Sequence, residues 1–260
     1  MIFSVFATVF SVLFPFPSPA SVLSLWKGFE PILYLVSAAL AGTFTALLWI
    51  QKSDFLSMFF SILRGLVYRS LGKSLDDKMS LFLVISLIPA LGTLFFAPTT
   101  PLSTLLPHWG TFLAFALPSL LLLRFRKWFK QNKFLPSWTW QEALLIGLLS
   151  ALSLWLDYPF WILAFIFVGF RGFTKDGGYR FALYHWTIVG IANWFLKNQE
   201  PFSQAVEDNL ITTLLAYIGA FALTLYLFRS TKERIPQIEV YWFALPLAMF
   251  YLGQFLLQLI

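Results

Sequence analysis

The chain has 260 residues, of which 59% are apolar and only 12% are charged. An ordinary soluble domain has about 25% charged residues, so the composition excludes a soluble protein and indicates one that lies in a bilayer. The net charge of +6 is typical of basic cytoplasmic loops in a membrane protein, and it gives no reason to expect nucleic acid as a partner. With no cysteine, and with His108 and His185 far apart, the sequence excludes disulfides and the common metal-binding motifs, and no cofactor is expected.

The first element is the apolar run Ile2–Phe14, which is followed by prolines at every second position. This run is shorter than the about 20 residues that a spanning helix needs. Proline lacks an amide donor and suits the start of a half-helix rather than its middle. Because Ala20–Trp26 is apolar again, we predict that residues 1–26 form a re-entrant hairpin. No Lys or Arg precedes the run, so a cleaved signal peptide is not expected.

Six later segments are apolar enough to be predicted as membrane spans, although the third is short. They are Ile32–Ile50, Met79–Ala97, Gly110–Leu123, Arg180–Leu196, Asn209–Phe228 and Val240–Ile260. Between the first two, Asp54–Arg69 is apolar on one face, with arginines toward its end. This pattern predicts an interfacial amphipathic helix over residues 54–69.

The distribution of Lys and Arg predicts which loops lie in the cytoplasm. Residues 98–109 contain no Lys or Arg and residues 197–208 contain only Lys197, so both are expected outside. The segments rich in Lys and Arg, which are expected inside, are 51–78, 124–141, 171–180 and 229–239. The C-terminus then lies outside, and the expected location is the bacterial inner (plasma) membrane.

Ala143–Phe170 is an apolar stretch that is interrupted at Asp157–Pro159. Basic segments predicted to be cytoplasmic flank it on both sides, so it has to enter and leave the membrane on the same face. It is therefore predicted to be a second re-entrant hairpin, opposite in orientation to the first. Two opposed hairpins indicate an inverted repeat, an architecture that places a binding site near the bilayer midplane. The predicted fold is one all-α polytopic membrane domain over residues 1–260, with about six transmembrane helices and two re-entrant hairpins.

Five segments carry a family resemblance, and they occur in the family's order. They are LFPFPSPASV (13–22), FEPILYLVSAALAGTFTALLWIQKSDFLSMF (29–59), MSLFLVISLIPALG (79–92), ALLIGLLSALSLWL (143–156) and GFTKDGGYRFALYHWTIVG (172–190). Together they resemble the undecaprenyl-pyrophosphate phosphatases. The resemblance implies six spans with two opposed hairpins, which agrees with the topology from loop charge. It also implies a polyprenyl pyrophosphate as the class of ligand.

The active-site residues of that family do not match. Its two glutamates fall at Thr8 and Val12, its turn histidine at Ser21 and its phosphate-binding arginine at Phe160. Hydrolysis of a pyrophosphate requires charge neutralisation and a group that activates water. We therefore expect a divergent, catalytically degenerate relative that binds or handles a polyprenyl phosphate. Two alternatives stay open: an active undecaprenyl-diphosphatase with non-standard residues, and a non-catalytic interaction subunit of a membrane complex.

Five polar residues are candidates for ligand binding, and each has a structural alternative. Ser18 and Ser21 either bind a phosphate or satisfy backbone groups in the turn. Asp157 is either a site acid or the cap of the following half-helix, and Arg180 either contacts a lipid phosphate or anchors its helix at the interface. His185 is either a proton relay or a buried histidine bonded to a hydroxyl. The expected partner is a membrane lipid, a polyprenyl phosphate or pyrophosphate, and a homodimer is left open.

Overall fold

The computed structural model describes residues 2–13, 33–68, 75–96, 139–155, 175–197 and 199–231, together with Leu256. The described residues are almost entirely helical and contain no strand. They form the helices α1 (Ile2–Leu13), α3 (Leu33–Val67), α4 (Leu75–Phe96), α7 (Trp140–Trp155), α9 (Lys175–Lys197) and α10 (Gln199–Thr231). The all-α class predicted from the sequence is confirmed for this part of the chain.

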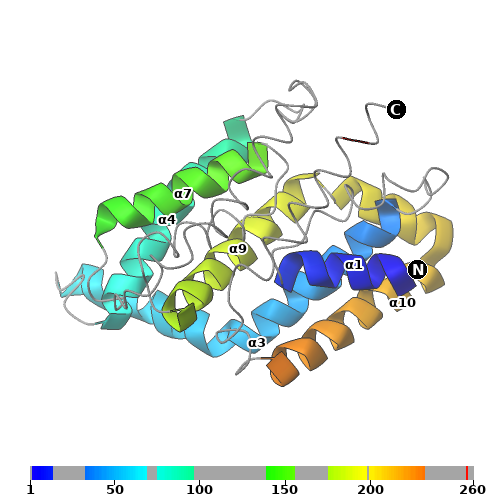
Figure 1. Cartoon of the computed structure of the whole chain (residues 1–260), viewed down its shortest axis with the longest axis horizontal. Helices are drawn as coiled ribbons and strands as arrows, with labels where there is room; N and C mark the ends of the chain where they lie inside the picture. Colours follow the sequence, from blue (N-terminus) through cyan, green and yellow to red (C-terminus); the bar gives the residue numbers. More distant parts are fainter. Residues whose placement is uncertain are drawn as a thin grey trace.

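Helix α9 lies between two groups of helices (Figure 1). On one side α4 packs against α7, and on the other side α3 packs against both α10 and α1. Helix α9 contacts α4 in the first group and α3 in the second. Every one of these helices contributes to the core, for example through the buried side chains of Val9, Leu47, Phe82, Ile146, Phe181 and Ala220.

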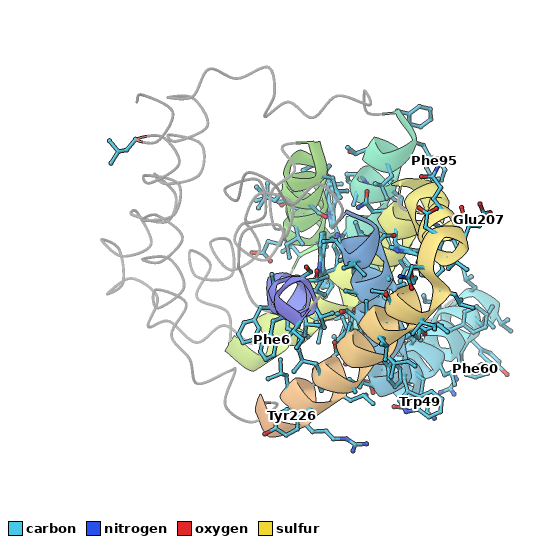
Figure 2. All side chains as sticks on the ribbon, turned by 90° about the vertical axis from the view of Figure 1, so that its right-hand side faces the viewer. Phe6, Trp49, Phe60, Phe95, Glu207 and Tyr226 are labelled. Carbon is cyan, nitrogen blue, oxygen red and sulfur yellow. The ribbon has the colours of Figure 1, made fainter. Side chains whose placement is uncertain are left out.

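Three of the described helices are long and apolar enough to cross a membrane: Leu35–Val67, Asp77–Phe96 and Val206–Arg229. Large apolar side chains also cover the outside of the bundle, and Figure 2 shows Phe6, Trp49, Phe60, Phe95 and Tyr226 there. Such a surface is costly in water and favourable in lipid. These two observations indicate a membrane protein.

Helix α3 has 35 residues and is about 52 Å long, which exceeds the roughly 30 Å hydrocarbon core of a bilayer. It begins one residue after the predicted start of the first span and passes through Asp54 to Val67 without a break. The segment predicted as a separate amphipathic helix is therefore the second part of one long helix. Its position at the membrane interface stays a prediction.

Helix α10 contains the predicted span Asn209–Phe228, and its backbone departs from helical geometry at Asn209 (φ −156°, ψ 82°). The Asn209 side chain accepts a hydrogen bond from the amide of Thr212 at 3.1 Å, as an N-cap does. The apolar part of α10 thus starts where the sequence predicts it. The exposed Glu207 and Asp208 precede this cap, in the polar first part of the helix.

Helices α1 and α7 cover the first halves of the two predicted hairpins. Helix α1 has 12 residues, about 18 Å, and packs against α3 and α10. Helix α7 begins with a capping box, in which the amide of Thr139 donates to Glu142 Oε2 at 2.8 Å and the amide of Glu142 donates to Thr139 Oγ1 at 3.4 Å. The turns and returning halves of both hairpins lie outside the described residues, as do Gly110–Leu123 and all of Val240–Ile260 except Leu256.

Two glycines allow the helices to approach closely. A Cβ added at Gly42 of α3 would collide with the main-chain oxygen of Tyr217 in α10, and one added at Gly147 of α7 would collide with the main chain of Ser86 in α4. Small residues at such contacts let backbones pack directly, which is the usual way that helices associate in a membrane. The second contact also brings α7 against the residue that bonds His185.

Candidate functional site

Ser86 of α4 and His185 of α9 form a hydrogen-bonded pair inside the bundle. Both side chains are fully buried, and Ser86 Oγ lies 2.8 Å from His185 Nδ1. Ser86 Oγ also lies 2.8 Å from the carbonyl oxygen of Leu83, to which it donates its single proton. The bond to His185 then requires the imidazole to donate its Nδ1–H to Ser86 Oγ. In the neutral ring this arrangement leaves Nε2 as a hydrogen-bond acceptor.

Helix α7 adds a second hydroxyl to this region. Ser150 follows Gly147 by one turn on α7, and Gly147 lies directly against the main chain of Ser86. The Ser150 side chain is fully buried, and its Oγ has no hydrogen-bond partner among the described residues. A buried hydroxyl without a partner costs about 1–3 kcal/mol, so this position favours an additional polar group beside it. Ser86 and His185 are in direct contact, and Ser150 is linked to them only through the packing of Gly147 against Ser86; we refer to Ser86, Ser150 and His185 as the α4–α7–α9 cluster.

Pro89 weakens α4 one turn beyond Ser86. Proline has no amide proton, so the carbonyl of Ile85 loses the partner that a regular helix would give it. The hydroxyl of Thr93 donates to the Pro89 carbonyl at 2.9 Å, one turn farther on, and does not replace the bond that the Ile85 carbonyl loses. The backbone beside the cluster is therefore less completely hydrogen-bonded than the rest of an ordinary helix.

The other side of α9 carries a second polar contact, with α3. The hydroxyl of Tyr184 donates to Asp54 Oδ2 at 2.6 Å, and its ring lies edge-on to Phe55 with a centroid distance of 5.6 Å. Farther along, Trp194 Nε1 donates to the Ser37 carbonyl at 3.0 Å. Residue numbers fall along α9 as they rise along α3, so the two helices run antiparallel.

Gln51 precedes Asp54 by one turn on α3 and is an unusual polar residue. Its side chain is only 2% exposed, and neither atom of its amide group has a hydrogen-bond partner among the described residues. An amide transferred from water to an apolar environment without compensation costs several kcal/mol. The position is therefore unfavourable unless something else contacts the amide.

The structure places the predicted site residues only in part. Ser18, Ser21 and Asp157 lie outside the described residues, and the Arg180 backbone belongs to α9 whereas its side chain is not described. His185 is described, and the predicted histidine bonded to a hydroxyl is confirmed by its bond to Ser86. The described part of the chain brings no two of these five candidates into contact.

Five polar residues of the two regions were not recognised in the sequence as site candidates: Gln51, Asp54, Ser86, Ser150 and Tyr184. Each is a polar residue within or at the end of an apolar segment, which is a signal in its own right because polar groups inside a membrane are costly. The identity of the helix that each faces could not be obtained from that signal.

No family model matches the chain, and neither a search of curated proteins nor a search of solved structures found a match. Within the described ranges, no three or more His, Cys, Asp or Glu side chains gather into a group that could hold a metal ion. The polar contacts inside the bundle are therefore the features that indicate a function.

Proposed function

We propose that the protein binds the head of a polyprenyl phosphate or a related lipid inside its helix bundle and does not hydrolyse it. The observation that carries this proposal is the α4–α7–α9 cluster, which consists of two buried hydroxyls and a buried imidazole inside the helix bundle. Polar groups inside a membrane protein usually face a partner, a cavity or a substrate. Of these groups, Ser150 can donate its hydroxyl proton to a phosphate oxygen, and His185 Nε2 can accept a proton from a protonated phosphate hydroxyl, so a phosphorylated lipid head suits this environment.

The proposed architecture has about six transmembrane helices and two opposed re-entrant hairpins, in the bacterial inner membrane and with the C-terminus outside. Two observations support it: α1 is too short to span a bilayer, and α7 begins at a capping box next to the predicted basic segment 124–141. In this arrangement the hairpin turns carry Ser18, Ser21 and Asp157 toward the lipid head. Arg180, near the start of α9, is the proposed cationic contact for the phosphate.

The absence of hydrolysis is supported by the environment of the two positions where the resembling family has glutamates. Thr8 and Val12 both lie on the buried face of α1, and the Thr8 hydroxyl donates to the Ser4 carbonyl at 2.7 Å. The Thr8 hydroxyl, which donates to its own helix, and the Val12 hydrocarbon supply neither a carboxylate for a metal ion nor a base. These positions thus serve packing.

A ligand assay on the purified full-length chain tests the proposal. Undecaprenyl phosphate should raise the unfolding temperature and bind in native mass spectrometry, and Ser150→Ala and His185→Ala should weaken binding at least tenfold. Ser57→Ala, at an exposed position of α3, is the matched control and should bind normally. Release of phosphate from undecaprenyl pyrophosphate would establish an active diphosphatase instead. Neither binding nor release, with a stable co-purifying subunit, would favour an interaction subunit.

A further inference from the structure

The α3–α9 contact places four polar side chains in two facing turns. Gln51 precedes Asp54 by three residues on α3, and Thr187 follows Tyr184 by three residues on α9, so each pair lies on one helix face. Because the helices run antiparallel and Tyr184 bonds Asp54, Gln51 lies opposite Thr187, one turn deeper in the bundle.

A second contact supports this register. A Cβ added at Gly190 would overlap the Phe44 ring, so that ring lies against α9 two turns beyond Gln51. Gln51 thus lies between two positions of α3 that touch α9, which explains why its side chain is only 2% exposed. Asp54, in contrast, is exposed, so the polar side chains extend from Asp54 at the surface of the protein to the buried amide of Gln51.

The hydroxyl protons of this group are already used. Tyr184 donates its hydroxyl proton to Asp54 Oδ2, and Thr187 donates its own to the Leu183 carbonyl at 2.7 Å. Each hydroxyl has one proton, so both oxygens can act toward a further group only as acceptors. Asp54 is likewise an acceptor when ionised, and Gln51 contributes a carbonyl oxygen. Apart from the two N–H protons of the Gln51 amide, the capacity that remains is therefore that of oxygen acceptors around one carboxylate.

No described Lys or Arg neutralises this carboxylate. Lys52, two residues away, instead places its Nζ 4.1 Å from the centroid of the Trp49 ring. Oxygen ligands are preferred by hard cations, and a single carboxylate balances a single positive charge. The same acceptors also suit the three donors of a primary ammonium group.

We propose that Gln51, Asp54, Tyr184 and Thr187 form a binding site for a monovalent cation, an alkali-metal ion or the ammonium of a lipid head. The bound cation accepts electron density from the Gln51 carbonyl and neutralises Asp54. This site lies on a different face of α9 from the bond between His185 and Ser86, because consecutive helical residues point about 100° apart, and it does not depend on the proposed binding of a polyprenyl phosphate.

Thermal unfolding of the full-length chain in phosphatidylcholine nanodiscs tests the site. Choline has no N–H donor, so choline chloride is the reference salt. We expect sodium or potassium chloride at the same ionic strength to raise the unfolding temperature by about 3 °C. A rise caused only by phosphatidylethanolamine in the nanodisc assigns the ammonium head in place of the alkali ion. A chain whose unfolding temperature responds to neither overturns the proposal.

Two variants connect that rise to these residues. Asp54→Asn and Gln51→Leu should both abolish it, whereas Asp208→Asn, which changes an exposed acid of α10, should preserve it. In choline chloride Gln51→Leu should unfold at a temperature no lower than the unsubstituted chain, because it removes an amide without a partner. A rise that persists in Gln51→Leu, or a lower unfolding temperature of that variant in choline chloride, would show that Gln51 serves packing alone.

Discussion

His185 and Ser86 are separated by 99 residues in the chain, and their side chains meet across two helices at 2.8 Å. Neither side chain is exposed, so this bond has no competition from water. In water-soluble proteins the loss of one partner from such a pair costs about 1–3 kcal/mol. Between membrane helices measured side-chain bonds average only about 0.6 kcal/mol, because the unfolded chain in the bilayer also finds partners.

The first prediction follows from that comparison. Ser86→Ala should lower the free energy of unfolding by about 0.5–1.5 kcal/mol, within the membrane range, since Leu83 keeps its carbonyl accessible to other donors. Reversible unfolding in mixed micelles measures this change, and a double-mutant cycle with His185→Ala isolates the bond itself. The exposed Ser57→Ala gives the control for loss of a hydroxyl. A coupling energy of zero in the cycle would contradict the bond.

At the scale of the elements, the closest helix contact is that between α3 and α10. Gly42 meets the main chain of Tyr217, and Ala38, Ala39 and Ala46 on the same helix are fully buried. This run of small residues allows the two backbones to pack directly. Main chain cannot move aside as a flexible side chain can, so the contact tolerates little added volume.

The second prediction uses two glycines in helices as a matched pair. Gly42→Ala should lower the free energy of unfolding by about 1–3 kcal/mol, because its methyl group meets the Tyr217 carbonyl. Gly92→Ala, whose methyl group would have nothing within 4 Å, should raise the same quantity by about 0.5–1 kcal/mol. Chemical unfolding of both variants gives the two signs, and equal signs would argue against the α3–α10 contact.

The third prediction concerns the break in α10. Asn209→Ala removes the acceptor for the Thr212 amide and should lower the free energy of unfolding by about 1 kcal/mol. Asn209→Asp keeps an oxygen acceptor and should change it by less than about 0.5 kcal/mol. The same unfolding assay compares them, and an alanine variant as stable as the aspartate variant would mean that the cap contributes nothing.

The boundaries of the elements show what the sequence determines. The cap at Asn209 follows from local chemistry, because an asparagine stands there at a polar-to-apolar change. The continuation of α3 past Asp54 was not predicted, because a charged turn followed by an amphipathic pattern has the same helical period as one uninterrupted helix. Helical periodicity identifies the helix but not whether it stops between two such segments.

At the scale of the whole molecule, long-range partners were the least predictable feature. A buried hydroxyl for His185 could be expected, since a buried imidazole needs a partner, but Ser86 could not be distinguished from the other hydroxyls of the chain. Likewise, nothing local to Gln51 or Ser150 indicates which helix each faces. Packing between helices decides these pairings, and packing depends on residues distant in the sequence.

The fourth prediction tests the threading of the chain through the membrane. The sequence contains no cysteine, so single cysteines can report accessibility to a membrane-impermeant maleimide on intact cells. Ser103→Cys should react from outside, whereas Ser137→Cys and Thr174→Cys should react only after permeabilisation. The last two positions flank residues 143–170. If Thr174→Cys reacted on intact cells and Ser137→Cys did not, residues 143–170 would cross the membrane once and would not be re-entrant.

Two consecutive residues of helix α9 bond different helices: Tyr184 bonds Asp54 of α3, and His185 bonds Ser86 of α4. Because α9 contacts both α3 and α4, a displacement of α9 at one contact also displaces it at the other. A cation beside Asp54 and a lipid head beside Ser86 would then be linked thermodynamically. If sodium changed the affinity for the lipid by some factor, the lipid would change the affinity for sodium by the same factor. A titration of either ligand in the presence of the other would measure this factor.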